Sequence, residues 1–279
     1  MTIYYVDGAI GNDANTGLAE GPGNAFASLQ QAVNTIVAGD TVYIKASTTY
    51  VEQVSGWPDG GFNNYISIIG YAGIPGDGGM VTFTWSSGAA FNGVGDYYWF
   101  KNITCFGSPF AGWALGSWNI CVNCISHTNS RAGFSHRGTI TLINSQSYGN
   151  GYYGNQGSGG SYPINAYGCV FRDNNWDQIY AAGAKLHNCV IYDAAPNDAA
   201  ATCGTSELQM VNCTIDGSNI TGAFNAIEGG NTPTLHAFNN IIIGGEYAIT
   251  VDPTVDYYHY IRHNLIFGTS LGNYEYPPY

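Results

Sequence analysis

A short pattern of apolar and polar positions is repeated eight times between about residues 98 and 268. Each copy has eight residues, with an apolar residue at position one and, in most copies, Asn at position three. The copies span residues 100–107, 121–128, 142–149, 166–173, 186–193, 210–217, 237–244 and 261–268. Successive copies start 20 to 27 residues apart, a period typical of solenoids, in which each unit stacks only on its neighbours.

The apolar positions indicate which kind of solenoid the chain forms. Positions one, four and six carry residues that suit a core, as in Leu186, Cys189 and Ile191. Because inward residues alternate along a strand, this change of parity predicts two short strands joined by a bend at position three. No copy has the i, i+3, i+4, i+7 spacing of a helical repeat. The pattern therefore predicts the coils of a β-helix.

Asparagine occupies position three in six of the eight copies. These residues are Asn102, Asn123, Asn144, Asn188, Asn212 and Asn239. Stacked one per coil, about 4.8 Å apart, their amides would hydrogen-bond to those above and below. The alternative is that Asn is present only because it favours turns. We expect a continuous structural ladder.

The residues before the repeat predict a strand at 3–8, a polar loop at 11–24 and one amphipathic helix. Ser28 and Gln31 have capping-box spacing, and Gly39 suits the residue after the helix. Strands are expected at 41–47, 64–73 and 80–86. We expect one domain, residues 1–279, with an N-terminal strand, loop and helix (1–40), irregular first coils (41–97), regular coils (98–268) and a C-terminal tail (269–279).

Two segments within residues 3–54 carry a family resemblance. YYVDGAIGNDANTG and AFASLQQAVNTIVAGDTVYIKASTTYVE closely resemble the N-terminus of the pectate lyase-like superfamily. The resemblance implies an all-β, right-handed, single-stranded parallel β-helix whose open N-terminal end is covered by the amphipathic helix. Such a cap would protect strand edges that are otherwise exposed. Function is less constrained, because this fold includes lyases, hydrolases, epimerases and non-catalytic viral spikes.

Composition narrows the set of partners. Charged residues make up 9% of the 279, and 7 Lys and Arg against 19 Asp and Glu give a net charge of −12. This argues against nucleic acid or an anionic membrane as a partner, and no apolar run approaches the ~18 residues of a membrane span. The start, MTIYYVDG, lacks the features of a signal peptide. We therefore expect no export unless a leader was removed.

The seven cysteines are expected to be free thiols. Cys121 and Cys124 have the spacing of half a zinc site or of a redox motif, but both fall on inward positions. Cys169 and Cys189 share a position in adjacent copies, where a disulfide would fit. The odd total and the lack of a secretory signal favour reduced, buried side chains.

Cleavage of a polysaccharide needs paired carboxylates for hydrolysis, or a base with a group that neutralises a uronate for elimination. The resemblance implies an Arg or Lys base and a Ca²⁺ ion held by several acids. The basic residues are spread over many copies, and one patch stands out. Its catalytic candidates are Arg172, Asp173, Asp177 and Asp193, and its substrate-binding candidates are Trp176, Tyr180 and Tyr192. The alternative is that these Asp residues end strands and cap turns.

The first loop offers a second candidate site. Asp7 and Asp13, with Asn12 and Asn15, are candidate Ca²⁺ ligands, although their spacing matches no EF-hand. Turn chemistry explains these residues equally well. We expect no cofactor, with Ca²⁺ as the one candidate.

Several outward positions are more apolar than a monomer needs. They include Val122, Ile143, Val211 and Phe238 at position two, Ile125, Val170, Val190, Ile241 and Leu265 at position five, and Ile243 and Phe267 at position seven. Such faces predict a buried interface, and we expect a homo-oligomer, most simply a side-by-side trimer. Coverage of the same faces by loops at 150–163 or 217–233 is the alternative.

Two functions agree with these features. The first is a non-enzymatic viral structural or adhesion protein, tail-spike-like or capsid-decorating, at the virion surface. It would contact other virion proteins or surface glycans and would bind rather than cleave. The few charges and the apolar outward positions favour it. The alternative is a secreted polysaccharide lyase or glycoside hydrolase that acts on an acidic or surface polysaccharide, with Tyr and Trp stacking on sugars.

Overall fold

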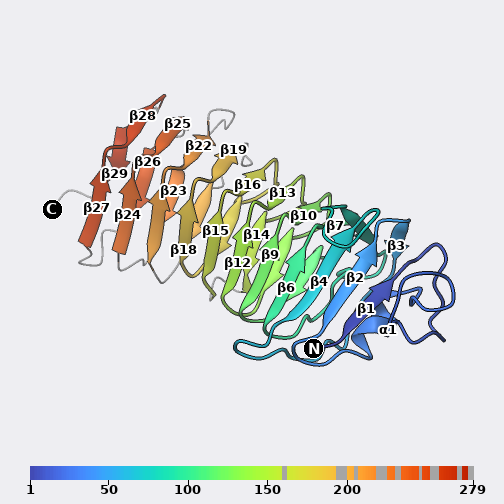
Figure 1. The fold of residues 1–279 in the computed structure, drawn as a ribbon. Coiled ribbons are helices and arrows are strands. Elements are labelled where there is room, and N and C mark those ends of the chain that lie inside the picture. Colours follow the sequence, from blue (N-terminus) through green and yellow to red (C-terminus); the bar gives the residue numbers. More distant parts are fainter. Residues whose placement is uncertain are drawn as a thin grey trace.

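The computed structural model of the protein describes residues 1–158, 162–192, 200–203, 207–217, 225–229, 234–244, 247–251, 258–268 and 272–275. Within these ranges the chain winds into an elongated solenoid with three parallel β-sheets along its length (Figure 1). Each regular coil adds one strand to sheet A, then one to sheet B, then one to sheet C. The expected parallel β-helix is confirmed.

Sheet A has 11 strands, in the spatial order β1 (Ile3–Val6), β2 (Thr41–Lys45), β4 (Ile66–Tyr71), β6 (Tyr98–Lys101), β9 (Asn119–Val122), β12 (Ile140–Ile143), β15 (Ile164–Tyr167), β18 (Ala184–His187), β21 (Leu208–Val211), β24 (Thr234–Phe238) and β27 (Tyr258–Arg262). Sheet B has 10 strands, namely β3 (Thr49–Val51), β5 (Val81–Thr84), β7 (Ile103–Phe106), β10 (Ile125–His127), β13 (Gln146–Tyr148), β16 (Val170–Arg172), β19 (Val190–Tyr192), β22 (Thr214–Gly217), β25 (Ile241–Gly244) and β28 (Leu265–Phe267). Sheet C has eight strands, namely β8 (Trp113–Leu115), β11 (Phe134–His136), β14 (Asn155–Gly157), β17 (Ile179–Ala181), β20 (Ala201–Cys203), β23 (Asn225–Gly229), β26 (Tyr247–Val251) and β29 (Gly272–Glu275).

Four consecutive coils contain the features discussed below. We number them coil I (98–118), coil II (119–139), coil III (140–163) and coil IV (164–183). Their strands pair in parallel and in register from one coil to the next. Equivalent residues of adjacent coils therefore lie about one strand spacing, roughly 4.8 Å, apart.

The bend between sheets A and B is formed by a single residue in the left-handed conformation. Asn occupies it in most coils, with φ of 58° at Asn102 and 55° at Asn188, and Gly168 and His263 occupy it in two others. Among non-glycine residues, Asn tolerates this conformation best because its short polar side chain makes local hydrogen bonds. The bend predicted at position three is thus confirmed.

The expected continuous ladder of these six asparagines is wrong. Asn102 is buried and its Oδ1 accepts a 2.8 Å hydrogen bond from Asn123 Nδ2. Beyond this pair the side chains of Asn144, Asn188, Asn212 and Asn239 are exposed. The bend projects them outward, where their amides are accessible to solvent. In the described part of the chain, tolerance of the left-handed conformation accounts for the repeated Asn.

The core lies between the three sheets and is built from the predicted inward positions. Leu186, Cys189 and Ile191 of one coil are at most 1% exposed. Six of the cysteines are buried and free, which confirms the expectation for them. They are Cys105, Cys121, Cys124, Cys169, Cys189 and Cys213. The side chain of Cys203 lies outside the described residues.

The single helix of the described residues, α1 (Leu29–Val33), lies beside β1 at the N-terminal end of the solenoid (Figure 1). It begins at Ser28, whose Oγ accepts a hydrogen bond from the Gln31 N–H. The apolar face of α1 joins the same core cluster as Val6 and Val42, so the helix covers the first coil as expected. It is shorter than predicted, and it is too short to cross a membrane.

Candidate functional site

The turns that connect sheet B to sheet C have the same six-residue length in coils I to IV. They span residues 107–112, 128–133, 149–154 and 173–178. Each begins with a residue in the left-handed conformation, Gly107, Thr128, Gly149 or Asp173. Because the turns have equal lengths, corresponding turn residues of adjacent coils lie next to one another along the solenoid axis.

A buried ladder of amide side chains fixes these turns. The Nδ2 of Asn129 donates a 2.9 Å hydrogen bond to Oδ1 of Asn150, and Asn150 Nδ2 donates a 2.8 Å bond to Oδ1 of Asn174. Asn174 Nδ2 in turn donates to Oε1 of Gln178. All four side chains are at most 2% exposed. We call these residues the buried amide ladder. It also satisfies backbone groups, because Asn129 N–H and Asn150 N–H donate to the next amide oxygen.

Serine hydroxyls and glycines lock the inner side of the turns. Ser126 Oγ donates to the carbonyl of Gly133, and Ser147 Oγ donates to that of Gly154, at 2.8 and 2.7 Å. A Cβ atom at Gly133 would lie 2.0 Å from Ser147 Oγ. Glycine is therefore required here, because any side chain would break the contact between the two coils. The turns are consequently held rigidly from inside.

On the outer side of these turns, one exposed or half-buried residue per coil forms a line along the solenoid axis. The line consists of Phe110, Arg131, Tyr152 and Trp176. The N–H of Arg131, Tyr152 and Trp176 each donates to the carbonyl of the preceding member, at 2.9, 3.0 and 3.0 Å. These bonds continue the β-ladder into the turn, so the four residues keep the rise of the coils.

Two further tyrosines widen this line toward sheet C. Tyr153 contacts Trp176 edge to face, with ring centroids 5.3 Å apart and planes at 87°, and it stacks on Tyr180 at 5.0 Å. Tyr152 meets Trp176 at 4.6 Å and 67°. We call Phe110, Arg131, Tyr152, Tyr153, Trp176 and Tyr180 the aromatic stripe. Trp176 is 43% exposed despite these contacts, so part of its ring remains open to a ligand.

A second line of rings lies on the outer face of sheet B and has the opposite geometry. His127 stacks between Phe106 and Tyr148 at interplanar angles of 13° and 2°, and the Arg172 guanidinium lies 4.3 Å from the Tyr148 centroid. In this sheet B ring stack the rings cover one another's faces, so edges face outward. Burial lowers the pKa of His127, which keeps the ring neutral. The stack therefore stabilises the sheet and offers little surface for stacking with a ligand.

The structure divides the patch predicted around Arg172. Trp176 and Tyr180 join the aromatic stripe, whereas Arg172 belongs to the sheet B ring stack and forms an ion pair with Asp173. Tyr192 pairs with Arg172 in sheet B. Asp177, next to Trp176 in the chain, is 7% exposed. Asp193 lies outside the described residues, so its pairing with Asp173 stays a prediction.

The two candidate Ca²⁺ ligands have internal partners. Asp7 Oδ1 accepts a 2.7 Å bond from Ser47 Oγ, and Asp7 Oδ2 lies 3.7 Å from Lys45 Nζ. Asp13 accepts hydrogen bonds from Ala27 N–H and from both N–H and Oγ of Ser28. The described residues contain no group of three or more His, Cys, Asp or Glu side chains placed for a metal ion. Loop and cap structure account for both residues.

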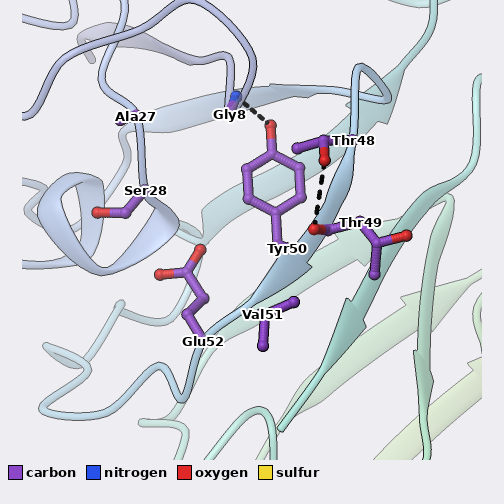
Figure 2. Close-up of a pocket in the computed structure, with 8 residues that line it drawn as sticks. All are labelled: Gly8, Ala27, Ser28, Thr48, Thr49, Tyr50, Val51 and Glu52. Atoms are coloured by element: carbon purple, nitrogen blue, oxygen red, sulfur yellow. Dashed lines mark hydrogen bonds between the residues drawn. The ribbon is translucent and has the colours of Figure 1, made fainter.

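A pocket of about 280 Å³ lies where α1 meets the first coil (Figure 2). Glu52 projects toward α1 and accepts hydrogen bonds from the N–H groups of Leu29 and Gln30, at 3.0 and 3.1 Å. Burial raises the pKa of Glu52. Tyr50 OH accepts from Gly8 N–H, and burial raises the pKa of Tyr50 to about 12. These polar groups are engaged in joining the helix to the coil, which indicates a structural role.

Phe110, Arg131, Tyr152 and Tyr153 were missed in the sequence, although a signal exists for the first three of them. Phe110, Arg131, Tyr152 and Trp176 each lie eight residues after the left-handed residue of their coil, at 102, 123, 144 and 168. Asn129, Asn150 and Asn174 of the buried amide ladder lie six residues after 123, 144 and 168. The eight-residue pattern of the repeat ends before both columns, so these regularities become visible only when the alignment is extended through the turn.

No protein-family model matches the sequence, and no curated protein sequence is significantly similar to it. Solved structures do resemble the fold. Pectate lyase Pel9A superimposes with a TM-score of 0.62 at 17% identity, over 99% of this chain and 78% of that one. A rhamnogalacturonan lyase gives 0.55 at 13% identity, over 99% and 87%. The A-module of the mannuronan C-5 epimerase AlgE4 of Azotobacter vinelandii gives 0.50 at 17%, over 98% and 86%.

These comparisons define the class of fold. The chain is a parallel β-solenoid that matches the right-handed β-helices of pectate lyase-like proteins, which confirms the resemblance seen in the sequence. At such identities the likeness shows the fold alone. The names of the three proteins describe polysaccharide lyases and an epimerase, which agrees with the carbohydrate-active alternative. They give no support to a viral structural role.

Proposed function

We propose that this protein binds an extended glycan along the aromatic stripe. The observation that carries the proposal is the line of outer residues at one turn position of coils I to IV, three exposed and one (Tyr152) half-buried, joined by backbone hydrogen bonds. The rise of about 4.8 Å per coil is close to the length of one sugar residue in an extended chain. A glycan lying along the axis would therefore meet one side chain per sugar.

The chemistry of the stripe suits sugars. A pyranose ring has an apolar face of C–H groups that packs on aromatic faces, and Tyr and Trp add polar atoms that can hydrogen-bond to hydroxyl groups. Trp176 is 43% exposed and Phe110 is 40% exposed, so their rings are available without rearrangement. The turns beneath are fixed by the buried amide ladder, which reduces the entropy that binding must remove.

Cleavage of the bound glycan, as by a polysaccharide lyase or a glycoside hydrolase, is the second candidate function. It is supported by the likeness to polysaccharide-active folds and by Asp177, a buried carboxylate next to Trp176 in the chain. Binding without cleavage would suit the adhesion role predicted from the sequence. A location on a virion stays a prediction.

The test of binding uses a glycan array followed by titration calorimetry. Trp176→Ala should weaken binding of any captured glycan about tenfold, since a lost aromatic contact of roughly 1.4 kcal/mol corresponds to that factor. Trp99→Ala is the matched control, because Trp99 is 47% exposed but lies on sheet A. Equal loss in both variants, or no loss at Trp176, would refute the proposal.

Cleavage is tested on the same captured glycans. New reducing ends without unsaturated ends would indicate hydrolysis, and new reducing ends accompanied by unsaturated non-reducing ends would indicate elimination. Asp177→Asn should abolish either product while leaving glycan binding within about threefold of the wild type. Intact glycans after prolonged incubation with the wild type would leave binding as the function.

A further inference from the structure

We propose that coil II holds a subsite for one anionic group of the glycan, and that the neighbouring coils take neutral sugars. The inference rests on the proposed function and names its substrate class: a mixed glycan with isolated carboxylate or sulfate groups, as opposed to a polyanion charged at every residue. The basis is the distribution of arginines around sheet C.

Coil II places two arginines on either side of one strand of sheet C. Arg131 lies three residues before β11 and Arg137 follows it directly, while Ser135 is its outward residue. Both arginines are exposed. Neither has an ion-pair partner among the described residues, in contrast to Lys45, Arg172 and Lys185, which pair with carboxylates.

Arg131 is held in place by rings instead of by an acid. Its guanidinium carbon lies 4.7 Å from the ring centroid of Phe110 and 5.5 Å from that of Tyr152. These ring contacts leave the edge of N–H donors without a hydrogen-bond partner among the described residues. That edge matches a carboxylate or sulfate, which Arg binds through two parallel hydrogen bonds. The site is thus oriented before an anion arrives.

The coils on either side have no equivalent cation. The same turn position carries Phe110, Tyr152 and Trp176 in coils I, III and IV. Ser135 pairs in sheet C with Ala114 and Gln156, both of which are uncharged. An anion placed on these coils would be desolvated against rings and amides without compensation.

Charge beyond coil II also disfavours a polyanion. The turn of coil IV contains Asp173 and Asp177, and the chain as a whole has a net charge of −12. A glycan with a charge on every residue would therefore be attracted at one coil and repelled at the others. A single anionic residue at coil II, followed by neutral sugars on coils III and IV, meets complementary groups throughout.

The test measures binding of three kinds of oligosaccharide of equal length by calorimetry: neutral, singly charged with a uronate or a sulfate, and fully uronated. We expect the singly charged members to bind about tenfold more tightly than the other two kinds. In Arg131→Gln/Arg137→Gln this preference should vanish, so that the neutral and the singly charged members bind with equal affinity. Arg262→Gln is the control, since Arg262 is exposed on sheet A.

The outcomes separate this inference from the proposed function. If Trp176→Ala weakens binding but the double Arg variant keeps the wild-type preference, the anion subsite is wrong and the glycan stripe stands. Tightest binding of the fully uronated or the neutral member also overturns the subsite. If no oligosaccharide binds through Trp176, both proposals fail. Repeating the titration below about pH 3 distinguishes a carboxylate, which is then protonated, from a sulfate, which is not.

Discussion

Asn150 Nδ2 donates a 2.8 Å hydrogen bond to Asn174 Oδ1 inside the solenoid, and both side chains are at most 1% exposed. Two residues further along each turn, Tyr152 and Trp176 meet on the outside. The buried pair thus fixes the position along the axis at which Tyr152 and Trp176 lie on the outer surface. This links the hydrogen bonding of the core to the geometry of the candidate binding surface.

Substituting Asn150 should lower both the free energy of unfolding and the affinity for a glycan. Asn150→Ala removes the acceptor of the buried Asn129 N–H and one hydrogen-bond partner each of Asn129 Nδ2 and Asn174 Oδ1, and we expect a loss of about 2–4 kcal/mol in the free energy of unfolding. Chemical denaturation measures it. Asn188→Gly is the control, because Asn188 is exposed at a left-handed bend where Gly fits, and it should change stability by less than about 1 kcal/mol. Equal effects of the two variants would contradict this assignment.

The buried thiols should be unreactive in the native protein. Burial raises the pKa of Cys105 and Cys121 well above the usual thiol value, so little thiolate exists at neutral pH. A hydrogen bond from Cys189 lowers the pKa of Cys169, but Cys169 is 0% exposed and remains out of reach of reagents. Thiol titration should find at most one fast-reacting group in the native state and 7 after denaturation. Two or more fast native thiols, or stoichiometric zinc, would contradict this prediction.

Stability should fall in acid because of His136. Its Nδ1 lies 2.7 Å from the Gly138 carbonyl and its Nε2 lies 3.1 Å from Asn155 Oδ1. Burial lowers the pKa of His136, so the folded state keeps the ring neutral while the unfolded chain protonates it below about pH 6.5. The unfolded state then binds more protons, and the free energy of unfolding decreases as the pH falls below that value.

The pH effect is isolated by comparing wild type with His136→Gln. Glu52 contributes with the opposite sign at lower pH, because burial raises its pKa and stability falls as the pH rises from about 4.5 toward the folded value. This contribution is common to both proteins and cancels in the difference. We expect the stability difference between them to shrink from pH 7 to pH 5. A constant difference over that range would show that His136 does not titrate on unfolding.

The predicted assembly remains open to a direct test. Outward apolar residues are exposed on sheet B, including Val190 at 38% and Leu265 at 57%. Burying roughly 800 Å² per partner along such a face would be ordinary for a stable interface. We expect multi-angle light scattering at micromolar concentration to give the mass of three chains. A monomer would remove the argument for a side-by-side trimer, and Leu265→Lys should dissociate the trimer if this face forms the contact.

The local pattern of the sequence determined the coil. Strand parity follows from alternation along a strand, so the inward positions of Leu186, Cys189 and Ile191 could be read directly. The bend at Asn188 and the N-cap at Ser28 could be predicted as well, because backbone conformation there depends on one or two neighbouring residues. Trp176 and Tyr180 were found because aromatic residues stand out in a polar loop.

Only the tertiary structure decided which repeated residues are buried in the core and which lie exposed on the surface. Asn188 and Asn174 look alike in the sequence, yet one is exposed at an outer bend and the other joins the buried amide ladder, because the direction of each turn depends on the sheets at both of its ends. For the same reason Arg172 and Trp176, four residues apart, belong to different faces. The stripe exists because the winding of the chain brings together residues that are about 21 to 24 positions apart in the sequence. These contacts form only between stacked coils, so the sequence of one coil does not reveal them.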